Sequence, residues 1–447
     1  MNAIGLDIGT TTICAAAADV NTGELLESVT VQNNCEINGA SFERCQNPLK
    51  ILEICVSALN KLIEKYSPVC SIGITGQMHG VIYLDSLGNP LSPLYTWQDT
   101  SADEECESGI TYAEKLSKIT GYKMASGFGC STYFVHSQKG CVPQGTAKIC
   151  TVHDYVAMKL TGRSTPVMHT SDAASFGLFD ADKLQFDSAA ITRAGLDCCV
   201  FPEIAADARI LGNYKEIPVC IAIGDNQASF IGSVRDTDSS VLVNIGTGSQ
   251  MSFMTRNTAE VESTELRPCH EKEFIRVGSA LCGGRAFAAL ESFIRQTANL
   301  CGGNLENAYS FIDEYLNTNQ SPANPLDVST AFVGTRENPT LRGHVKNIGL
   351  DNFTPGHLIY GVLDAISGEL YNMYSPCPDK AHSCVVGSGN GLRKNHALQK
   401  IISEMFGMPL LIPAHKEEAA YGAMLYSLTA CGIYPDLKAA QSLIKYL

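Results

Sequence analysis

The chain has 447 residues, a length beyond which one hydrophobic core stops growing, so two or more domains are expected. Hydrophobic residues make up 45% of the chain and charged residues 17%, a composition that supports buried cores and excludes a disordered chain. The 46 acidic side chains outnumber the 32 basic ones, and the formal charge of −14 opposes binding to nucleic acid or to an anionic membrane surface.

The first twelve residues lack a basic segment and carry Asp7 within an apolar run, so we expect no secretory signal and a cytoplasmic protein. The longest uncharged stretch, residues 66–84, contains a proline, three glycines and His79, which is a poor composition for a membrane helix. The 18 cysteines are scattered without a CxxC pair, which indicates reduced thiols and no zinc or iron–sulfur site.

Two similar segments predict two glycine-turn hairpins. Residues 7–12 read Asp-Ile-Gly-Thr-Thr-Thr, and residues 244–249 read Asn-Ile-Gly-Thr-Gly-Ser, each between apolar, β-prone flanks. The recurrence near the half-length indicates two related domains. The polar segment 235–240 is the expected hinge, which gives domains 1–236 and 237–447.

Such turns can bind phosphate, because glycines let backbone N–H groups approach an anion and threonine hydroxyls add donors. Asp7 adds a carboxylate where a hydrated Mg²⁺ would bind. An ordinary hairpin with a solvated aspartate is the competing interpretation, and the repetition favours phosphate.

Between and after the hairpins, apolar strands alternate with helical periodicity, which predicts an α/β fold. Residues 49–66 predict a helix, and residues 70–74 predict the strand that follows it. Further helices are predicted at 286–300 and 397–406.

Two polar motifs in the first half favour polyol binding. Residues 75–80 read Thr-Gly-Gln-Met-His-Gly after a predicted strand, and residues 97–99 read Trp-Gln-Asp with the only tryptophan of the chain. Together they offer amide, imidazole and carboxylate groups. A structural role is the alternative for the single histidine.

Two further motifs place polar groups at strand ends. Asp225 follows a predicted strand and begins a probable helix, where it either caps the helix or accepts a proton from a substrate hydroxyl that attacks a phosphoryl group. Residues 385–391 form a third glycine-rich turn, before a helix that includes Asn395, and this geometry suits a nucleotide.

Six of these segments occur in the order seen in FGGY-family carbohydrate kinases, and the resemblance spans nearly the whole chain. They are residues 7–12, 76–80, 97–99, 224–227, 244–247 and 387–390. The resemblance implies an α/β fold with two actin-like, ribonuclease-H-like domains that face a central cleft and close over a sugar and MgATP. It is compatible with a homodimer.

The resemblance also implies a role for each matching position. Asp225 would be the catalytic base and Asp7 the carboxylate near Mg²⁺. The residues that would bind ATP are Thr10, Thr11, Thr12, Gly246, Thr247, Gly387, Ser388, Gly389, Asn390 and Asn395. The residues that would bind the sugar are Gln77, Met78, His79, Trp97, Gln98, Asp99 and Asn226.

Within the family, residues 96–99, 127–132 and 151–155 are more similar to kinases of the seven-carbon ketose sedoheptulose than to xylulose kinases. The implied reaction is ATP-dependent phosphorylation of a ketose at its terminal primary hydroxyl, from sedoheptulose to sedoheptulose 7-phosphate. Phosphorylation of xylulose to xylulose 5-phosphate is the alternative. Thr100-Ser101 stands where the family usually has Gly-Arg, and Gly387-Ser388-Gly389 replaces a common triple glycine.

Two other classes of protein are weaker interpretations. An actin-like chaperone ATPase would need a peptide-binding module, and a sugar-responsive regulator would need a DNA-binding module or a basic patch. We expect neither module from this sequence.

Overall fold

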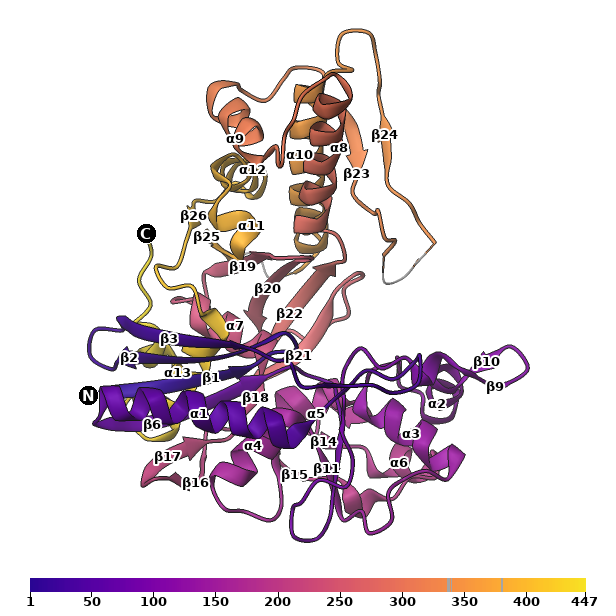
Figure 1. The fold of residues 1–447 in the computed structure, drawn as a ribbon, viewed down its shortest axis with the longest axis vertical. Coiled ribbons are helices and arrows are strands. Elements are labelled where there is room, and N and C mark those ends of the chain that lie inside the picture. The colour runs from indigo at the N-terminus through magenta and orange to yellow at the C-terminus, as the bar shows by residue number, and fades with distance from the viewer. Residues whose placement is uncertain (336–337, 339, 379–380) are drawn as a thin grey trace. The chain divides into compact units, whose positions relative to one another are not determined.

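The computed structural model describes residues 1–335, 338, 340–378 and 381–447, and the polypeptide divides into two compact α/β units (Figure 1). Unit 1 comprises residues 1–235, 267–274 and 417–445, and unit 2 comprises residues 236–266, 275–416 and 446–447. Throughout the described residues, no helix is both long enough and apolar enough to cross a lipid bilayer.

Unit 1 is built on a mixed sheet whose first hairpin is the predicted one. Strands β1 (Asn2–Ile8) and β2 (Thr12–Asp19) pair antiparallel, and β6 (Val69–Gly76) lies parallel to β1 on its other side. The order across the sheet is β16 (Ile210–Tyr214), β17 (Ile217–Cys220), β6, β1, β2 and β3 (Leu25–Gln32). The short β18 (Ile223–Gly224) also pairs with β6.

Helices cover both faces of this sheet. Helix α1 (Pro48–Tyr66) begins at an Asn47 cap and packs on the face that carries Ile4 and Leu6. Successive residues of a strand point to opposite faces, so Gly5 faces the other side, where α13 (Glu418–Ala430) lies. The predicted helix at 49–66 and strand at 70–74 are thereby confirmed as α1 and β6.

Glycines allow α13 to approach the sheet closely. A Cβ added at Gly5 would lie 1.7 Å from the Ala420 carbonyl oxygen, and one at Gly73 would lie 1.8 Å from that of Ala423. Helix α13 also contacts α7 (Asp225–Ser233), where a Cβ at Gly422 would meet the Ala228 carbonyl oxygen at 1.8 Å. The helix backbones therefore rest directly on their neighbours.

The chain leaves unit 1 after Arg235, beside the boundary predicted at 236, but two later segments that the sequence suggested for the second domain pack with unit 1. Residues 417–445 do so through the glycine contacts of α13. Residues 267–274 do so through backbone contacts, because Gln227 of α7 donates to the Pro268 carbonyl at 2.8 Å and the Glu271 N–H donates to Ala206 at 2.7 Å.

Residues 77–205 add further helices to unit 1, drawn in purple and magenta in Figure 1. They are α2 (Tyr112–Thr120), α3 (Gly129–Lys139), α4 (Val152–Leu160), α5 (Thr170–Phe176) and α6 (Ser188–Arg193). Two short strands, β12 (Val167–His169) and β15 (Glu203–Ala205), pair in parallel beside them.

Unit 2 has its own sheet, which contains the second predicted hairpin, β19 (Ser240–Ile245) and β20 (Ser249–Thr255). Strand β25 (Cys384–Ser388) lies parallel to β19, with β26 (Leu410–Leu411) beyond it and β22 (Glu273–Ala280) beside β20.

Three long helices complete the core of unit 2. They are α8 (Gly284–Leu300), α10 (Pro355–Tyr374) and α12 (His396–Phe406), packed through buried apolar residues such as Leu290, Leu363 and Ile402. The helices predicted at 286–300 and 397–406 are therefore confirmed. Smaller elements are α9 (Tyr309–Thr318), α11 (Asn390–Arg393) and the hairpin of β23 (Asp327–Ser329) and β24 (His344–Lys346).

Candidate active site

The carboxyl ends of three parallel strands meet at one edge of the unit 1 sheet. Asp7 of β1 pairs with Thr75 of β6, and Gly224 of β18 pairs with Gly76. Ligands of open α/β sheets bind at such edges, where strands pass into turns and helices. The register therefore brings Asp7 and Asp225 to the same edge of the sheet.

Asp225 is the first residue of α7, after the N-cap Gly224. The capping position is thus held by a glycine, which has no side chain, and Asp225 stands one residue inside the helix, so N-capping does not explain the aspartate. The pKa of Asp225 is raised to about 6, because burial and the Asp172 carboxylate raise it more than the cations His153 and Arg267 lower it. A carboxylate with this pKa is largely ionised at neutral pH, as a general base must be.

Asp7 carries a buried oxygen, Oδ1, that has no hydrogen-bond partner among the described residues. Burial and the carboxylates of Asp225 and Glu417 raise the pKa of Asp7 to about 7, although His153 opposes the rise. A divalent cation would relieve this repulsion, and carboxylate oxygens are the ligands that Mg²⁺ prefers. The residues present therefore fit a magnesium ion.

Four polar side chains near this edge form a closed hydrogen-bond network. The Thr10 hydroxyl donates to Gln77 Oε1 at 3.1 Å and accepts from Trp97 Nε1 at 2.9 Å. Gln77 Nε2 donates to Gln46 Oε1 at 2.8 Å, and Gln46 Nε2 donates to the Thr10 carbonyl at 2.9 Å. The network joins Thr10, predicted to bind ATP, to two residues predicted to bind the sugar.

A cavity of about 620 Å³ adjoins this network. It is lined by Thr10, Thr96, Gln98 and residues 36–41 and 43–46. Hydroxyl, amide and charged groups therefore surround a space that is large enough for a polyol chain.

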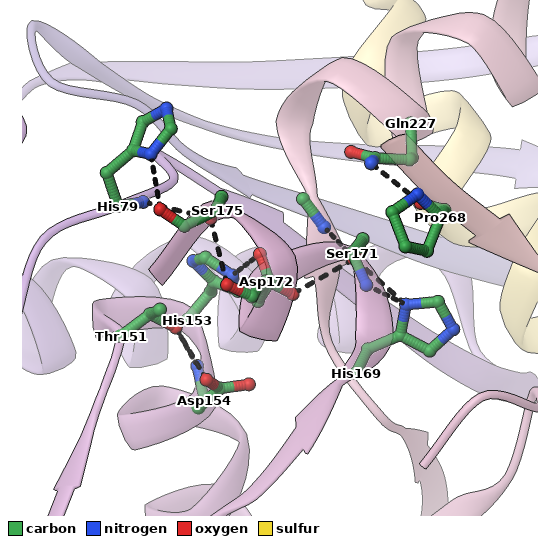
Figure 2. A network of polar contacts seen from close by, with 11 residues as sticks. His79, Thr151, His153, Asp154, His169, Ser171, Asp172, Ser175, Gln227 and Pro268 are labelled. Carbon is green, nitrogen blue, oxygen red and sulfur yellow. Dashed lines mark hydrogen bonds and ion pairs between the residues drawn. The ribbon is translucent and has the colours of Figure 1, made fainter. Parts of the chain in front are cut away.

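The turn after β6 places Met78 and His79 beside Asp225 and α5. His79 has φ 76°, a left-handed value that is uncommon for residues other than glycine and that occurs at ligand sites. Its Nδ1 lies 2.7 Å from the Ser175 carbonyl oxygen (Figure 2). Its ring also stacks on Phe128, with centroids 4.8 Å apart. A Cβ on Gly224 would lie 2.7 Å from the Met78 sulfur, so Met78 packs against the backbone that presents Asp225.

Two other residues predicted to bind the sugar have protein partners. Asp99 is buried and accepts from the Ser101 N–H at 3.0 Å and from the Ser101 hydroxyl, which fixes the turn after Trp97. Burial raises the pKa of Asp99. Asn226 Oδ1 accepts from Arg267 at 3.2 Å.

Asn33 braces the turn of the first hairpin. Its side-chain amide donates to the Gly9 carbonyl and its N–H donates to the Thr11 carbonyl, both at 2.8 Å. The Thr11 side chain is exposed, and Thr12 begins β2 opposite Gln32.

Unit 2 brings together its own glycine turns. The carbonyls of Gly246 and Thr247 accept the N–H groups of Gly284 and Arg285 at 2.9 and 3.1 Å, which attaches the second hairpin to the start of α8. Thr247 is exposed at this turn.

The turn after β25 packs against the same hairpin. Asn244 donates to the Ser388 hydroxyl at 2.7 Å, and a Cβ on Gly389 would lie 2.5 Å from the Ile245 carbonyl oxygen. Gly387 ends the strand with Ser388, and Asn390 is exposed at the start of α11. Asn395 precedes α12 and caps it by accepting from the Leu398 N–H at 2.9 Å, so it does not lie within the predicted helix.

Several residues at the site were not identified from the sequence. They are Gln46 in the amide network, Asp172 and Ser175 on α5, and Glu417 and Arg267 near the two aspartates. The one available signal was the run of small residues 170–175, four of them polar, directly after a short strand.

Comparisons with known proteins identify the family of the chain. Family models of carbohydrate kinases of the FGGY family match residues 2–242 with the N-terminal domain and residues 241–431 with the C-terminal domain. A sedoheptulokinase from Mus musculus is 25% identical over 95% of this chain and 97% of its own length.

Solved structures show the same fold. A ligand-bound xylulose kinase from Lactobacillus acidophilus has a TM-score of 0.84 and 20% identity over 100% of this chain and 92% of its own. A Plasmodium falciparum glycerol kinase with ADP has a TM-score of 0.81 and 19% identity over 99% of this chain and 92% of its own. These likenesses and the two α/β units confirm the predicted fold class. The two family models together cover most of the chain, and the chain therefore belongs to the FGGY family of carbohydrate kinases.

Proposed function

We propose that this kinase transfers the γ-phosphoryl group of MgATP to the terminal primary hydroxyl of a ketose, with sedoheptulose as the preferred substrate and sedoheptulose 7-phosphate as the product. The observation that carries the proposal is the meeting of Asp225 and Asp7 at one sheet edge, beside a network of amide and hydroxyl groups. The 25% identity to a sedoheptulokinase supports the choice of sugar.

Asp225 would accept the proton of the attacking hydroxyl. Its pKa of about 6 leaves it ionised at neutral pH, and its place at the start of α7 fixes its backbone. No covalent intermediate is required, because phosphoryl transfer depends mainly on positioning and charge stabilisation.

Asp7, with Glu417 nearby, would hold Mg²⁺. When bound, the cation supplies neutralisation of the charge that develops on the phosphoryl oxygens. The turns at Gly246 and Gly389 in unit 2 expose the backbone groups that we propose for the nucleotide.

The amide network and its neighbouring cavity would orient the sugar. Gln77, Gln46 and Trp97 present directional donors and acceptors, and Gln98 extends them along the cavity wall. A seven-carbon chain has more hydroxyls to satisfy than a five-carbon chain, and a site that bonds each hydroxyl discriminates against a substrate that lacks one. On this argument we propose sedoheptulose over xylulose, and xylulose remains the alternative substrate, since a xylulose kinase of Staphylococcus xylosus is 24% identical to this chain.

A substrate panel tests the proposal. With saturating MgATP we expect kcat/KM to be higher for sedoheptulose than for xylulose and negligible for glycerol, measured by coupled release of ADP. A tenfold preference for xylulose, about 1.4 kcal/mol of transition-state binding, would reverse the assignment of the sugar. Absence of sugar-dependent ADP release with every ketose would refute the proposed reaction.

A further inference from the structure

A fully buried ion pair lies in unit 1 between α4 and α5. His153 Nε2 is 2.9 Å from Asp172 Oδ1, and neither side chain is accessible to solvent (Figure 2). The neighbouring Asp154 is also buried and accepts from the Thr151 hydroxyl at 2.7 Å. Burying ions costs several kcal/mol each, and such a pair is weak evidence for a gain in stability. Its position relative to the catalytic aspartate suggests another role.

Three carboxylates act on the charge of the His153 ring, and the uncharged Gly76 of β6 also lies against it. Asp154 comes from α4, Asp172 from α5 and Asp225 from the start of α7, while the charge of the ring is also felt by Asp7 on β1. Burial by itself would lower the pKa of His153, but these carboxylates raise it to about 9, so the ring is a cation at neutral pH.

The donor atoms of His153, Asp154 and Asp172 lie within 4.8 Å of one another, a spacing that could also suit a metal ion. A proton on the ring supplies the positive charge that these carboxylates require. The interpretation as an imidazolium is therefore sufficient, and a metal at this cluster becomes an outcome that the experiment can detect.

Helix α5 connects the ion pair to the backbone that presents Asp225 and to the turn that carries His79. The second oxygen of Asp172 accepts from the Ser171 hydroxyl at 3.2 Å, and the Ser171 oxygen accepts from the Gly224 N–H at 3.0 Å, one residue before Asp225. At the other end of the helix, Ser175 holds the turn of His79 through its carbonyl and its hydroxyl (Figure 2).

We propose that His153 is a positioning residue for phosphoryl transfer, a buried cation that fixes α5 through Asp172 and keeps Asp225 ionised. The inference rests on the proposed function, because it concerns the same site. His153 acts through Asp172 and through the electric field at Asp225, and it has no assigned contact with the sugar.

Three variants separate the charge of the ring from its shape. His153→Gln removes the charge, and His153→Lys keeps a cation on a different side chain. His136→Gln is the matched control, because His136 is also buried and bonds Tyr83, but burial lowers its pKa to about 4 and leaves it neutral. The measurement is the pH profile of kcat/KM for the ketose at saturating MgATP, with thermal unfolding to verify the fold.

For His153→Gln we expect the acid limb of the kcat/KM profile to move to a pH that is higher by about one unit. A nearby cation lowers the pKa of a carboxylate by about this amount, and the variant removes that cation from Asp225. The loss from this shift should be about fivefold at pH 6 and nearly absent at pH 8.5. His153→Lys should keep the limb close to that of the wild type, and His136→Gln should not move it. The proposal would be overturned if the His153→Gln profile coincided with that of the wild type. It would also be overturned if His153→Gln and His153→Lys lost kcat/KM equally at every pH.

A second measurement does not depend on the variants being folded or active. In wild-type protein labelled at its histidine ring nitrogens, one of the ten rings should remain doubly protonated at pH 8. Absence of such a ring, with or without a stoichiometric metal in the purified wild-type protein, would refute the imidazolium. A wild type that phosphorylates no sugar would refute the proposed function, whereas an active enzyme with an unshifted profile refutes only the role of His153.

Discussion

Substitution of Asp225 by asparagine tests the central step of the reaction. Asparagine has almost the same size and preserves the start of α7, since the cap of that helix is Gly224. The asparagine amide, however, cannot accept the proton of the substrate hydroxyl. The variant therefore removes the base while leaving the backbone that presents it.

The size of the effect follows from the protonation state. With a pKa of about 6, Asp225 is about 90% ionised at pH 7 and about 10% ionised at pH 5. Loss of a general base lowers kcat by about 10²- to 10⁴-fold, which corresponds to about 3–5 kcal/mol in activation free energy. The wild-type rate should fall below pH 6, whereas the residual rate of the variant should lack this acid limb.

The assay is steady-state ADP release over pH 5–8.5, with ketose and ATP saturating. Mg²⁺ must also be saturating, because removal of the Asp225 charge lowers the pKa of Asp7 and so alters the metal titration. Asp182→Asn, which changes an exposed carboxylate, serves as the control. A folded Asp225→Asn enzyme with near-normal kcat would refute the role of this aspartate as the base.

Three further perturbations are informative. Asp7→Asn should raise the Mg²⁺ requirement and lower turnover. It should also raise the free energy of unfolding at pH 8 in EDTA by an amount on the order of 1–4 kcal/mol, seen as a higher Tm, because a folded pKa of about 7 means that stability falls as pH rises from about 4 through 7. An unchanged Mg²⁺ titration would contradict the metal role. Trp97→Phe removes the donor to Thr10 and should raise KM for the sugar by about three- to tenfold with little change in kcat; an unchanged KM would exclude the network from binding. Gly73→Ala should destabilise unit 1 by about 1–3 kcal/mol in thermal unfolding, because its Cβ would meet the α13 backbone. Gly368→Ala, with no contact closer than 4.0 Å among the described atoms, is the tolerated control.

Local signals were sufficient for the two hairpins and the long amphipathic helices. Glycine and threonine turns between apolar strands predicted both hairpins, and helical periodicity predicted α1, α8 and α12. The return of α13 to unit 1 could not be predicted, because this helix is buried nearly all round and shows no amphipathic pattern. Its partners, Gly5 and Gly73, are more than 300 residues away in the sequence.

The candidate site also combines residues that local sequence patterns predict with residues that only the tertiary fold brings together. Asp7 and Asp225 belong to motifs that the sequence marks at strand ends. Gln46 ends a strand of only two residues and Asp172 lies within α5, so neither stands in such a motif, and both reach the site only through the tertiary fold. Asp99 and Asn395 have suitable chemistry for a ligand, yet both bond to residues close in sequence. An Asp two residues before a serine, and an Asn three residues before a helical N–H, are patterns that could have indicated these local bonds.

The packing of α13 on β1 and β6 has a consequence for the synthesis of the protein on the ribosome. The first strands emerge early, but the helix that covers one face of their sheet is translated after nearly all of unit 2. Until then, α13 does not cover the face that carries Gly5 and Gly73. The sheet therefore remains incompletely packed, a state that chaperones protect from aggregation. A premature stop codon before residue 417 should therefore damage the unit that holds Asp225, the proposed base, more than the unit in which the truncation occurs.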